Sequence, residues 1–207
     1  SFRQVDLELI LAVDCSYSVD TAEFDLQKIG LAEAFRHPAI LAAIRAGKYG
    51  AIRVVMVEWS DPDSQVVAVP WTTVHDAASA AALAAKIDSA PRLTQEGATS
   101  ISSMIEFGLT LFAANRSADT RRVIDISADG RNNMGARITV MRAHAAATGV
   151  TVNGLAILNE VPTLDFYFLK YVIAGSDAFV MRADDYGHYA LAILRKLIRE
   201  ISIPPVS

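Results

Sequence analysis

Short apolar runs and stretches with helical spacing alternate along nearly the whole chain. Residues 9–13 form a continuous apolar run, which is typical of a central parallel strand covered on both faces. The pattern predicts strands at 9–13, 51–59, 65–71, 122–127, 150–158 and 178–181, and helices at 21–35, 39–46, 75–87, 100–114, 136–148, 165–173 and 184–201. This alternation predicts an α/β fold around a mostly parallel sheet.

The turn at 60–64 separates two of the predicted strands and is rich in Ser, Asp and Pro. Because the turn is short, the strands on either side of it should pair antiparallel. Pro70 lacks an N–H group to donate to a neighbouring strand, which places the second of these strands at an edge of the sheet. One antiparallel edge strand is therefore expected.

Two of the predicted helices show an apolar face. Asp20 and Glu23 form the pattern of a capping box at the start of the helix at 21–35. The residues predicted to form the buried face of this helix are Ala22, Leu26, Ile29 and Phe35. The last helix carries a similar stripe, formed by Tyr189, Ile193, Leu197 and Ile201.

Three residues inside or at the ends of strands need their own interpretation. Glu58 either hydrogen-bonds near the site or is solvated, and solvation is favoured because an acid at a strand end usually faces water. Trp59 is predicted to pack in the core or at its rim. Asp125 interrupts an apolar strand and needs a partner if it is buried, so we expect it to support a neighbouring loop.

The first strand runs directly into an Asp-x-Ser-x-Ser loop formed by Asp14, Ser16 and Ser18. These oxygens lie at the carboxyl end of a strand, the edge where open α/β sheets bind ligands. One carboxylate and two hydroxyls supply only oxygen, which suits Mg²⁺, Mn²⁺ or Ca²⁺ rather than Zn²⁺ or Cu²⁺. Three oxygens cannot fill an octahedron, so the loop predicts further ligands elsewhere in the chain.

Two residues at comparable places are candidates for the missing ligands. Thr99 lies in a glycine-containing loop just before a predicted helix, and Asp129 follows a predicted strand. Each has a structural alternative, because Thr is a common helix cap and Asp a common turn residue. Asn132 and Asn133 follow Asp129, and they are either ligand contacts or turn formers.

The three loops together resemble the metal-ion-dependent adhesion site of the von Willebrand factor type A (vWA) domains. That site uses an Asp-x-Ser-x-Ser loop, a Thr from a second loop and an Asp before Gly from a third. The resemblance implies a metal site formed by Asp14, Ser16, Ser18, Thr99 and Asp129. It also implies a Rossmann-like, three-layer α/β/α, doubly wound fold. In this class the final helix can move when a ligand binds the metal.

Within this class the chain is similar to a bacterial subfamily of uncharacterised function. The similarity rests on Val-Glu-Trp-Ser at 57–60 and on Ser-Ala-Asp-Gly-Arg-Asn-Asn at 127–133. One departure is Ala128, where many relatives have Thr before the Asp. The missing hydroxyl keeps open a metal-free scaffold whose loops are only structural turns.

Composition narrows the domain count and the partners. The chain has 207 residues, of which 52% are hydrophobic and 20% charged, and this predicts one domain covering 1–207. A net charge of −4 and a pI near 5.5 argue against a nucleic-acid partner and against an anionic lipid surface. No stretch is long and apolar enough to span a bilayer. The chain starts without Met, which suggests processing or trimming.

Cys15 is the single cysteine, so no disulfide can form within the chain. It lies between two proposed metal ligands, but alternate side chains of that loop point away from the metal. No histidine stands near it in sequence to activate a thiolate. Packing is therefore favoured over nucleophilic catalysis for Cys15.

These features favour a divalent-metal-dependent protein-binding module and not an enzyme. A partner Asp or Glu would complete the metal shell. The first alternative is a Mg²⁺-dependent phosphoester hydrolase, although residue 16 is Ser where such chemistry needs a second acid. The second is the metal-free scaffold. The resemblance further suggests an exported protein, periplasmic or extracellular, while a cytoplasmic location stays open.

Overall fold

The computed structural model describes residues 3–94, 97–113 and 120–203. A six-stranded sheet runs through its centre in the order β3-β2-β1-β4-β5-β6. The strands are β1 (Leu7–Asp14), β2 (Ile52–Trp59), β3 (Gln65–Val74), β4 (Arg121–Ala128), β5 (Thr151–Ile157) and β6 (Val180–Ala183). All neighbours are parallel except β2 and β3, which pair antiparallel. The predicted antiparallel edge strand is confirmed.

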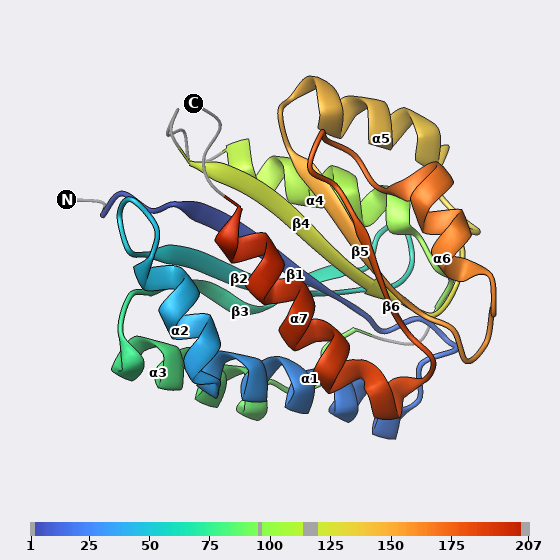
Figure 1. Cartoon of the computed structure of the whole chain (residues 1–207). Coiled ribbons are helices and arrows are strands. Elements are labelled where there is room, and N and C mark those ends of the chain that lie inside the picture. Colours follow the sequence, from blue (N-terminus) through green and yellow to red (C-terminus); the bar gives the residue numbers. More distant parts are fainter. Residues whose placement is uncertain (1–2, 95–96, 114–119, 204–207) are drawn as a thin grey trace.

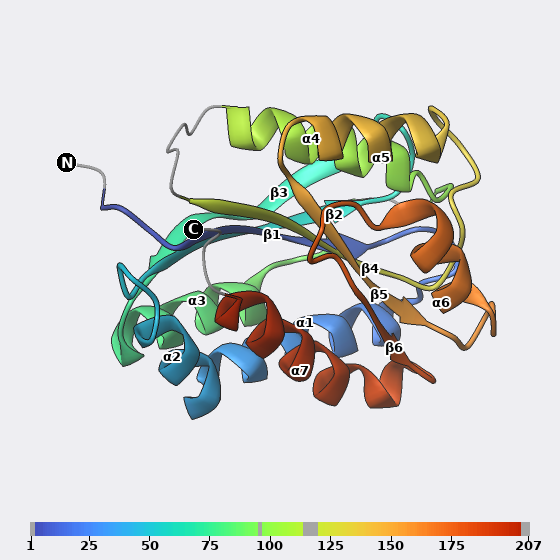
Figure 2. The same ribbon diagram turned by 45° about the horizontal axis from the view of Figure 1, so that its top comes forward.

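Helices cover both faces of this sheet. They are α1 (Thr21–Arg36), α2 (Pro38–Arg45), α3 (Ala77–Ser89), α4 (Ile101–Ala113), α5 (Ile138–Ala147), α6 (Leu164–Tyr167), the π-helical η1 (Phe168–Val172), the 3₁₀ turn η2 (Tyr186–His188) and α7 (Tyr189–Ser202). The first three helices and α7 lie on one face, and α4, α5 and α6 lie on the other (Figures 1 and 2). The predicted three-layer, doubly wound α/β/α architecture is confirmed.

The central strand β1 is buried along its whole length, as its apolar run predicts. It lies between β2 and β4, and Val13 is in register with Glu58 on one side and with Ser127 on the other. The three parallel strands therefore end at the same edge of the sheet. The loops that follow β1 and β4 meet there, which positions the candidate site.

Helix α1 begins with the predicted capping box, in which Asp20 accepts from Glu23 N and Glu23 accepts from Asp20 N. Its predicted buried face is wrong for all but Phe35, because Ala22 is exposed, and Leu26 is 40% and Ile29 46% exposed. The buried residues of α1 are Phe24, Gln27, Gly30, Leu31, Ala32, Ala34 and Phe35. Contacts with both α3 and α7 decide which face of α1 is buried. The spacing of apolar residues within α1 does not predict that face.

The predicted apolar stripe of the last helix is confirmed. Tyr189, Ile193, Leu197 and Ile201 are all buried against the sheet. Gly154 marks a close approach in β5, because a Cβ at this position would lie 2.1 Å from Cδ1 of Phe168.

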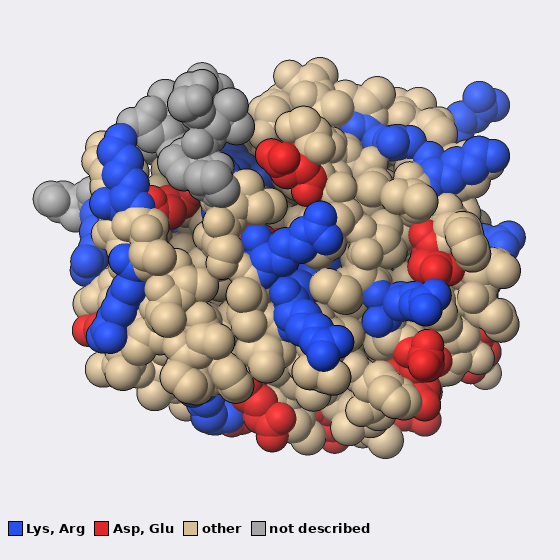
Figure 3. Space-filling model, viewed as in Figure 1, with Lys and Arg blue, Asp and Glu red and all other residues tan. Residues whose placement is uncertain are grey.

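Charged side chains of both signs are interspersed over the face that carries α1, α2 and α7 (Figure 3). None of the described helices is long and apolar enough to cross a membrane.

Candidate metal site

The end of β1 delivers Asp14 to the edge of the sheet, where its side chain is fully buried. Asp14 Oδ1 accepts a hydrogen bond of 2.8 Å from the main-chain N–H of Ser16, which folds the loop back over the carboxylate. Gln27 Nε2 in α1 donates to the main-chain oxygen of Asp14 at 3.1 Å. Asp14 Oδ2 is buried and has no hydrogen-bond donor.

Ser18 connects this loop to the loop that follows β4. Its hydroxyl donates to Asp129 Oδ1 at 2.5 Å and lies 3.3 Å from Ser16 Oγ. Tyr186 in η2 donates its phenol proton to Asp129 Oδ2 at 3.1 Å. Both oxygens of Asp129 are therefore occupied by hydroxyl donors, and the two sequence motifs meet as predicted.

Thr99 comes to the same place from the loop before α4. Its main-chain N–H donates to Asn133 Oδ1 at 2.9 Å, and Asn133 N donates back to Thr99 O at 2.9 Å. A Cβ at Gly130 would lie 3.7 Å from Thr99 Oγ1, so the hydroxyl approaches the turn after Asp129. Asn132 accepts from Ser102 N in α4 at 3.0 Å. The two asparagines thus fix the residues at the start of α4 by hydrogen bonds. Sequence alone leaves open whether they contact a ligand or form a turn.

Glu58 was expected to be solvated, and this prediction is wrong. The residue is fully buried, and its Oε2 accepts from Leu93 N at 2.6 Å and from Thr94 N at 3.0 Å. Burial raises the pKa of this carboxyl, while the two N–H donors oppose that shift. Glu58 therefore fixes the segment that leads towards Thr99. Its partners lie 35 and 36 residues away, so local sequence could not reveal them.

Replacing Glu58 by Ala is expected to lower the free energy of unfolding by about 1–3 kcal/mol, because the part-buried N–H of Leu93 and the buried N–H of Thr94 would lose their acceptor. Amide hydrogen exchange at Leu93 and Thr94 should rise with it. Glu33→Ala, at an exposed position of α1, is the control and should change stability little. Unchanged exchange at both amides in Glu58→Ala would contradict this role.

Asp61 holds the same loop further along. Its Oδ1 accepts from Ala98 N at 2.6 Å, and a Cβ at Gly97 would lie 2.3 Å from Asp61 Oδ2. Gly97 is therefore needed for this close approach. Residues 95 and 96 of the loop lie outside the described residues.

Two acids meet at the centre of the site. Burial raises the pKa of Asp14 to about 7, and the charge of Asp129 adds to the shift. Burial also raises the pKa of Asp129, against the hydrogen bonds from Ser18 and Tyr186. Two buried carboxylates whose charges interact are costly without a cation or a proton. A divalent cation would remove this cost and satisfy Asp14 Oδ2.

The donor set fits a hard cation. Two carboxylates and up to three hydroxyls offer oxygen only, which suits Mg²⁺ or Mn²⁺. No cluster of three or more His, Cys, Asp or Glu side chains that could hold a metal occurs among the described residues. The candidate site has only two acids, so it depends on Ser16, Ser18 and Thr99 to complete a ligand set.

An open groove of about 850 Å³ lies over these loops. Ser18, Thr99 and Asp129 line it together with Arg131 and Glu160. The side chain of Tyr17, which also lines the groove, is 78% exposed. A macromolecular side chain can therefore reach the oxygen cluster from solvent.

Ala128 and Cys15 both pack in the interior. Ala128 lies in the apolar layer between the sheet and α4, with Ile126 and Ala156. Cys15 is buried in the opposite layer, as predicted. Burial raises the pKa of the Cys15 thiol, and the charges of Glu58 and Asp14 add to the shift. The thiol is therefore protonated at neutral pH and unsuited to act as a nucleophile.

This architecture is the von Willebrand factor type A fold, as comparison with solved structures shows. Proximal thread matrix protein 1 (PTMP1) from the mussel byssus, with a zinc-occupied metal-ion-dependent adhesion site (MIDAS) motif, matches 94% of this chain at 18% identity, with a TM-score of 0.72. The pilus adhesin SpaC from Lactobacillus rhamnosus GG matches 97% at 14% identity, with a TM-score of 0.67. A von Willebrand factor type A protein from Catenulispora acidiphila matches 96% at 16% identity, with a TM-score of 0.61.

These likenesses concern the fold, since the identities are low. The chain spans 47%, 31% and 43% of the lengths of these three structures. Residues 4–205 match the model of a family described as "Protein of unknown function (DUF1194)", and the chain belongs to that family. A search of functionally curated proteins gave no match.

Proposed function

We propose that the protein is a divalent-metal-dependent protein-binding module. Asp14, Ser16, Ser18, Thr99 and Asp129 would hold Mg²⁺ or Mn²⁺, with Ca²⁺ as a further candidate. The observation that carries the proposal is the buried Asp14 Oδ2, which has no donor and lies in a site with a second carboxylate and hydroxyl groups. The zinc-occupied motif of PTMP1 supports divalent metal binding on this fold.

The partner would supply an Asp or Glu side chain. Protein oxygens leave part of the shell of a hard cation to water, and a carboxylate can replace that water through the open groove. Tyr17, Arg131 and Glu160 on the walls of the groove would contact the residues around that acid. We further propose that the protein is exported, because the structural relatives include a byssus matrix protein and a pilus adhesin.

A peptide selection tests this function without a known partner. Phage-displayed peptides are selected on the immobilised protein in Mg²⁺ and eluted with a chelator. The eluted sequences should share an Asp or Glu, and synthetic versions should lose binding when that acid becomes Asn or Gln. Binding should also be lost in Asp14→Ala and kept in Asp63→Ala, which removes an exposed acid of the turn before β3.

Peptides that bind equally well in chelator, or equally well to Asp14→Ala, would contradict the proposal. The hydrolase alternative makes a different prediction, which is Mg²⁺-dependent turnover of p-nitrophenyl phosphate. Residue 16 is Ser, so the second acid that such chemistry needs next to Asp14 is missing at this position.

A further inference from the structure

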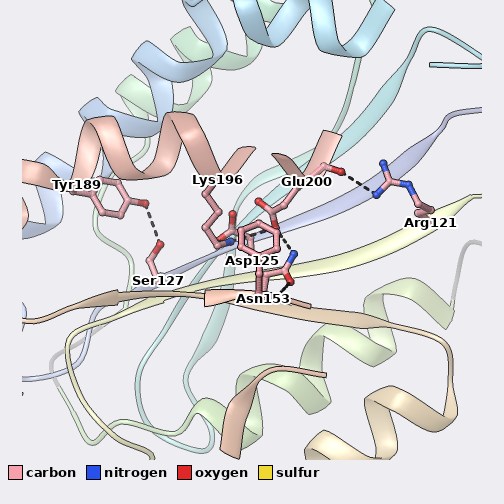
Figure 4. A network of polar contacts seen from close by, with 8 residues as sticks. Arg121, Asp125, Ser127, Asn153, Tyr189, Lys196 and Glu200 are labelled. Atoms are coloured by element: carbon pink, nitrogen blue, oxygen red, sulfur yellow. Dashed lines mark hydrogen bonds and ion pairs between the residues drawn. The ribbon is translucent and has the colours of Figure 1, made fainter. Parts of the chain in front are cut away.

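A second polar cluster lies beneath α7, away from the candidate metal site. Strand β4 presents Asp125 and Ser127, two residues apart, to this helix (Figure 4). Lys196 Nζ lies 2.5 Å from Asp125 Oδ1, and the Tyr189 phenol lies 3.1 Å from Ser127 Oγ. The face of β4 under α7 is thus anchored to the helix by polar contacts.

Glu200, one turn further along α7, brings a second carboxyl to the same ammonium group. Its Oε2 lies 3.2 Å from Lys196 Nζ and accepts from Asn153 Nδ2 at 3.0 Å. Asn153 Oδ1 accepts from Phe179 N at 3.0 Å, which fixes the direction of the amide. The prediction that Asp125 supports a neighbouring loop is wrong, because its partner is Lys196 in α7.

The charges of this cluster do not balance if both carboxyls are ionised. Asp125, Lys196 and Glu200 are each at most 1% exposed, and they comprise two acids and one ammonium group. Asp125 Oδ2 and Glu200 Oε1 are buried without a donor. An uncompensated buried charge is costly, whereas one added proton would neutralise the cluster and supply the missing donor.

Two other groups near Glu200 are Arg121, whose charge interacts with that of Glu200, and Tyr189. Arg121 in β4 uses its guanidinium to donate to the main-chain oxygens of Glu200 and Ile201, at 2.9 and 3.2 Å. The Tyr189 phenol is paired with Ser127, and burial raises its pKa, so it stays neutral. Asp177 adds negative charge near Arg121. Lys196 is therefore the one cation that contacts the two carboxyls through its side chain, among the described residues.

Burial raises the pKa of Glu200 well above that of an ordinary glutamate, and the charge of Asp125 adds to this shift. The charge of Lys196 and the amide of Asn153 oppose it. A cavity of about 540 Å³ at the opposite end of β4 from the metal site includes Glu200 and Asn153 in its wall. Glu200 therefore lies in the wall of a cavity through which its carboxyl can exchange a proton with solvent.

We propose that Asp125, Lys196 and Glu200 form a proton-controlled latch, which holds α7 on the sheet while Glu200 carries a proton and weakens when Glu200 loses it. The latch is independent of the metal site, because none of its residues contacts the proposed ligands. Its effect has a defined sign. The latch contributes its full stability below the ordinary pKa of a glutamate. This contribution falls as the pH rises and levels off above the raised pKa that Glu200 has in the folded protein.

The test compares the wild-type protein with Glu200→Gln, in chelator, from about pH 5 to about pH 10. Glutamine keeps the shape of the protonated side chain and cannot ionise. We compare the exchange rates of α7 amides in the two proteins, corrected for intrinsic rates. The ratio of the wild-type rate to the Glu200→Gln rate should rise by up to about tenfold per pH unit and then level off. Glu106→Gln, at an exposed position of α4, should behave as the wild type.

Infrared spectroscopy of the wild-type protein gives a second readout that does not depend on a variant. At neutral pH it should show the carbonyl band of a buried protonated carboxylic acid, which shifts on ¹³C-labelling of glutamate and disappears at alkaline pH. The absence of such a band would overturn the proposal. A ratio of α7 exchange between wild type and Glu200→Gln that stays constant over the whole pH range would also overturn it.

Discussion

Replacing Asp14 by Ala is expected to abolish saturable Mg²⁺ binding. Calorimetric titration of the chelator-treated protein should show one site, and the variant should lose about a hundredfold or more in affinity, since removing even a group that only supports a metal ligand typically costs 10–100-fold. The physical reason is that Asp14 is fully buried and holds an oxygen without a donor at the centre of the cluster. Mn²⁺ should bind the same site.

The affinity for Mg²⁺ should fall as the pH is lowered. In the metal-free protein the pKa of Asp14 is about 7, raised by burial and then by the charge of Asp129. Mg²⁺ needs the ionised carboxylate, so it must displace a proton at lower pH. The apparent affinity should fall about tenfold per pH unit below that pKa and level off above it.

The raised pKa of Asp14 also predicts how the stability of the metal-free protein changes with pH. Because the pKa of Asp14 is raised in the folded state, this residue's contribution to stability decreases as the pH rises from the ordinary aspartate range to about 7. Asp14→Asn should therefore lose Mg²⁺ binding and yet unfold at a higher temperature than the metal-free wild type at alkaline pH. That combination separates a lost ligand from a lost fold.

Asp63→Ala is the matched control, since it removes an exposed acid of the neighbouring turn and should leave Mg²⁺ binding unchanged. If the intact protein takes up neither Mg²⁺ nor Mn²⁺, the metal-free scaffold is the better interpretation, and Ala128 is the feature that supports it. If Asp14→Ala binds as tightly as the wild type, the metal lies elsewhere in the chain.

The sequence predicts the architecture well because its signals are local. The apolar runs and the helical spacing place the strands and helices to within a few residues, except that the last helix begins at Tyr189 rather than at Asp184. The Asp-x-Ser-x-Ser loop, Thr99 and Asp129 follow strands or precede a helix at one edge, so topology brings them together once the strand order is right. The proximity of these loops therefore follows from the order of the strands in the sheet.

The parts that sequence missed depend on pairs that are far apart in the chain. Asp129 accepts from Tyr186, which lies 57 residues away, and nothing in the spacing of the last helix indicates this contact. Leu26 and Ile29 match the apolar period of α1 but face outward, because α3 and α7 together select another face. Long-range packing decides such cases.

The contact between Lys196 and Asp125 is the largest of these omissions, and it leads to a strong prediction. A lysine in an amphipathic C-terminal helix is usually a solvated residue. Here both side chains are buried, with 2.5 Å between Nζ and Oδ1. The cluster under α7 therefore depends on one ammonium group that sequence gives no reason to place in the interior.

Replacing Lys196 by Met is expected to lower the free energy of unfolding by about 3–5 kcal/mol, the usual cost of leaving a buried charge without its partner. Methionine keeps most of the apolar stem, so the loss reports the charge rather than the packing. Urea denaturation at neutral pH measures it. Lys86→Met, on the exposed face of α3, is the control and should change stability by less than about 0.5 kcal/mol.

The double variant Lys196→Met with Asp125→Asn separates charge from shape. With a proton on Glu200, the double variant has no ionised group in the cluster, so most of the lost stability should return. The single variant Asp125→Asn should lose less stability than Lys196→Met, because Glu200 can then lose its proton and pair with Lys196. If the double variant is as unstable as the sum of the two single variants, the cluster is not held by charge compensation and Lys196 acts mainly through packing.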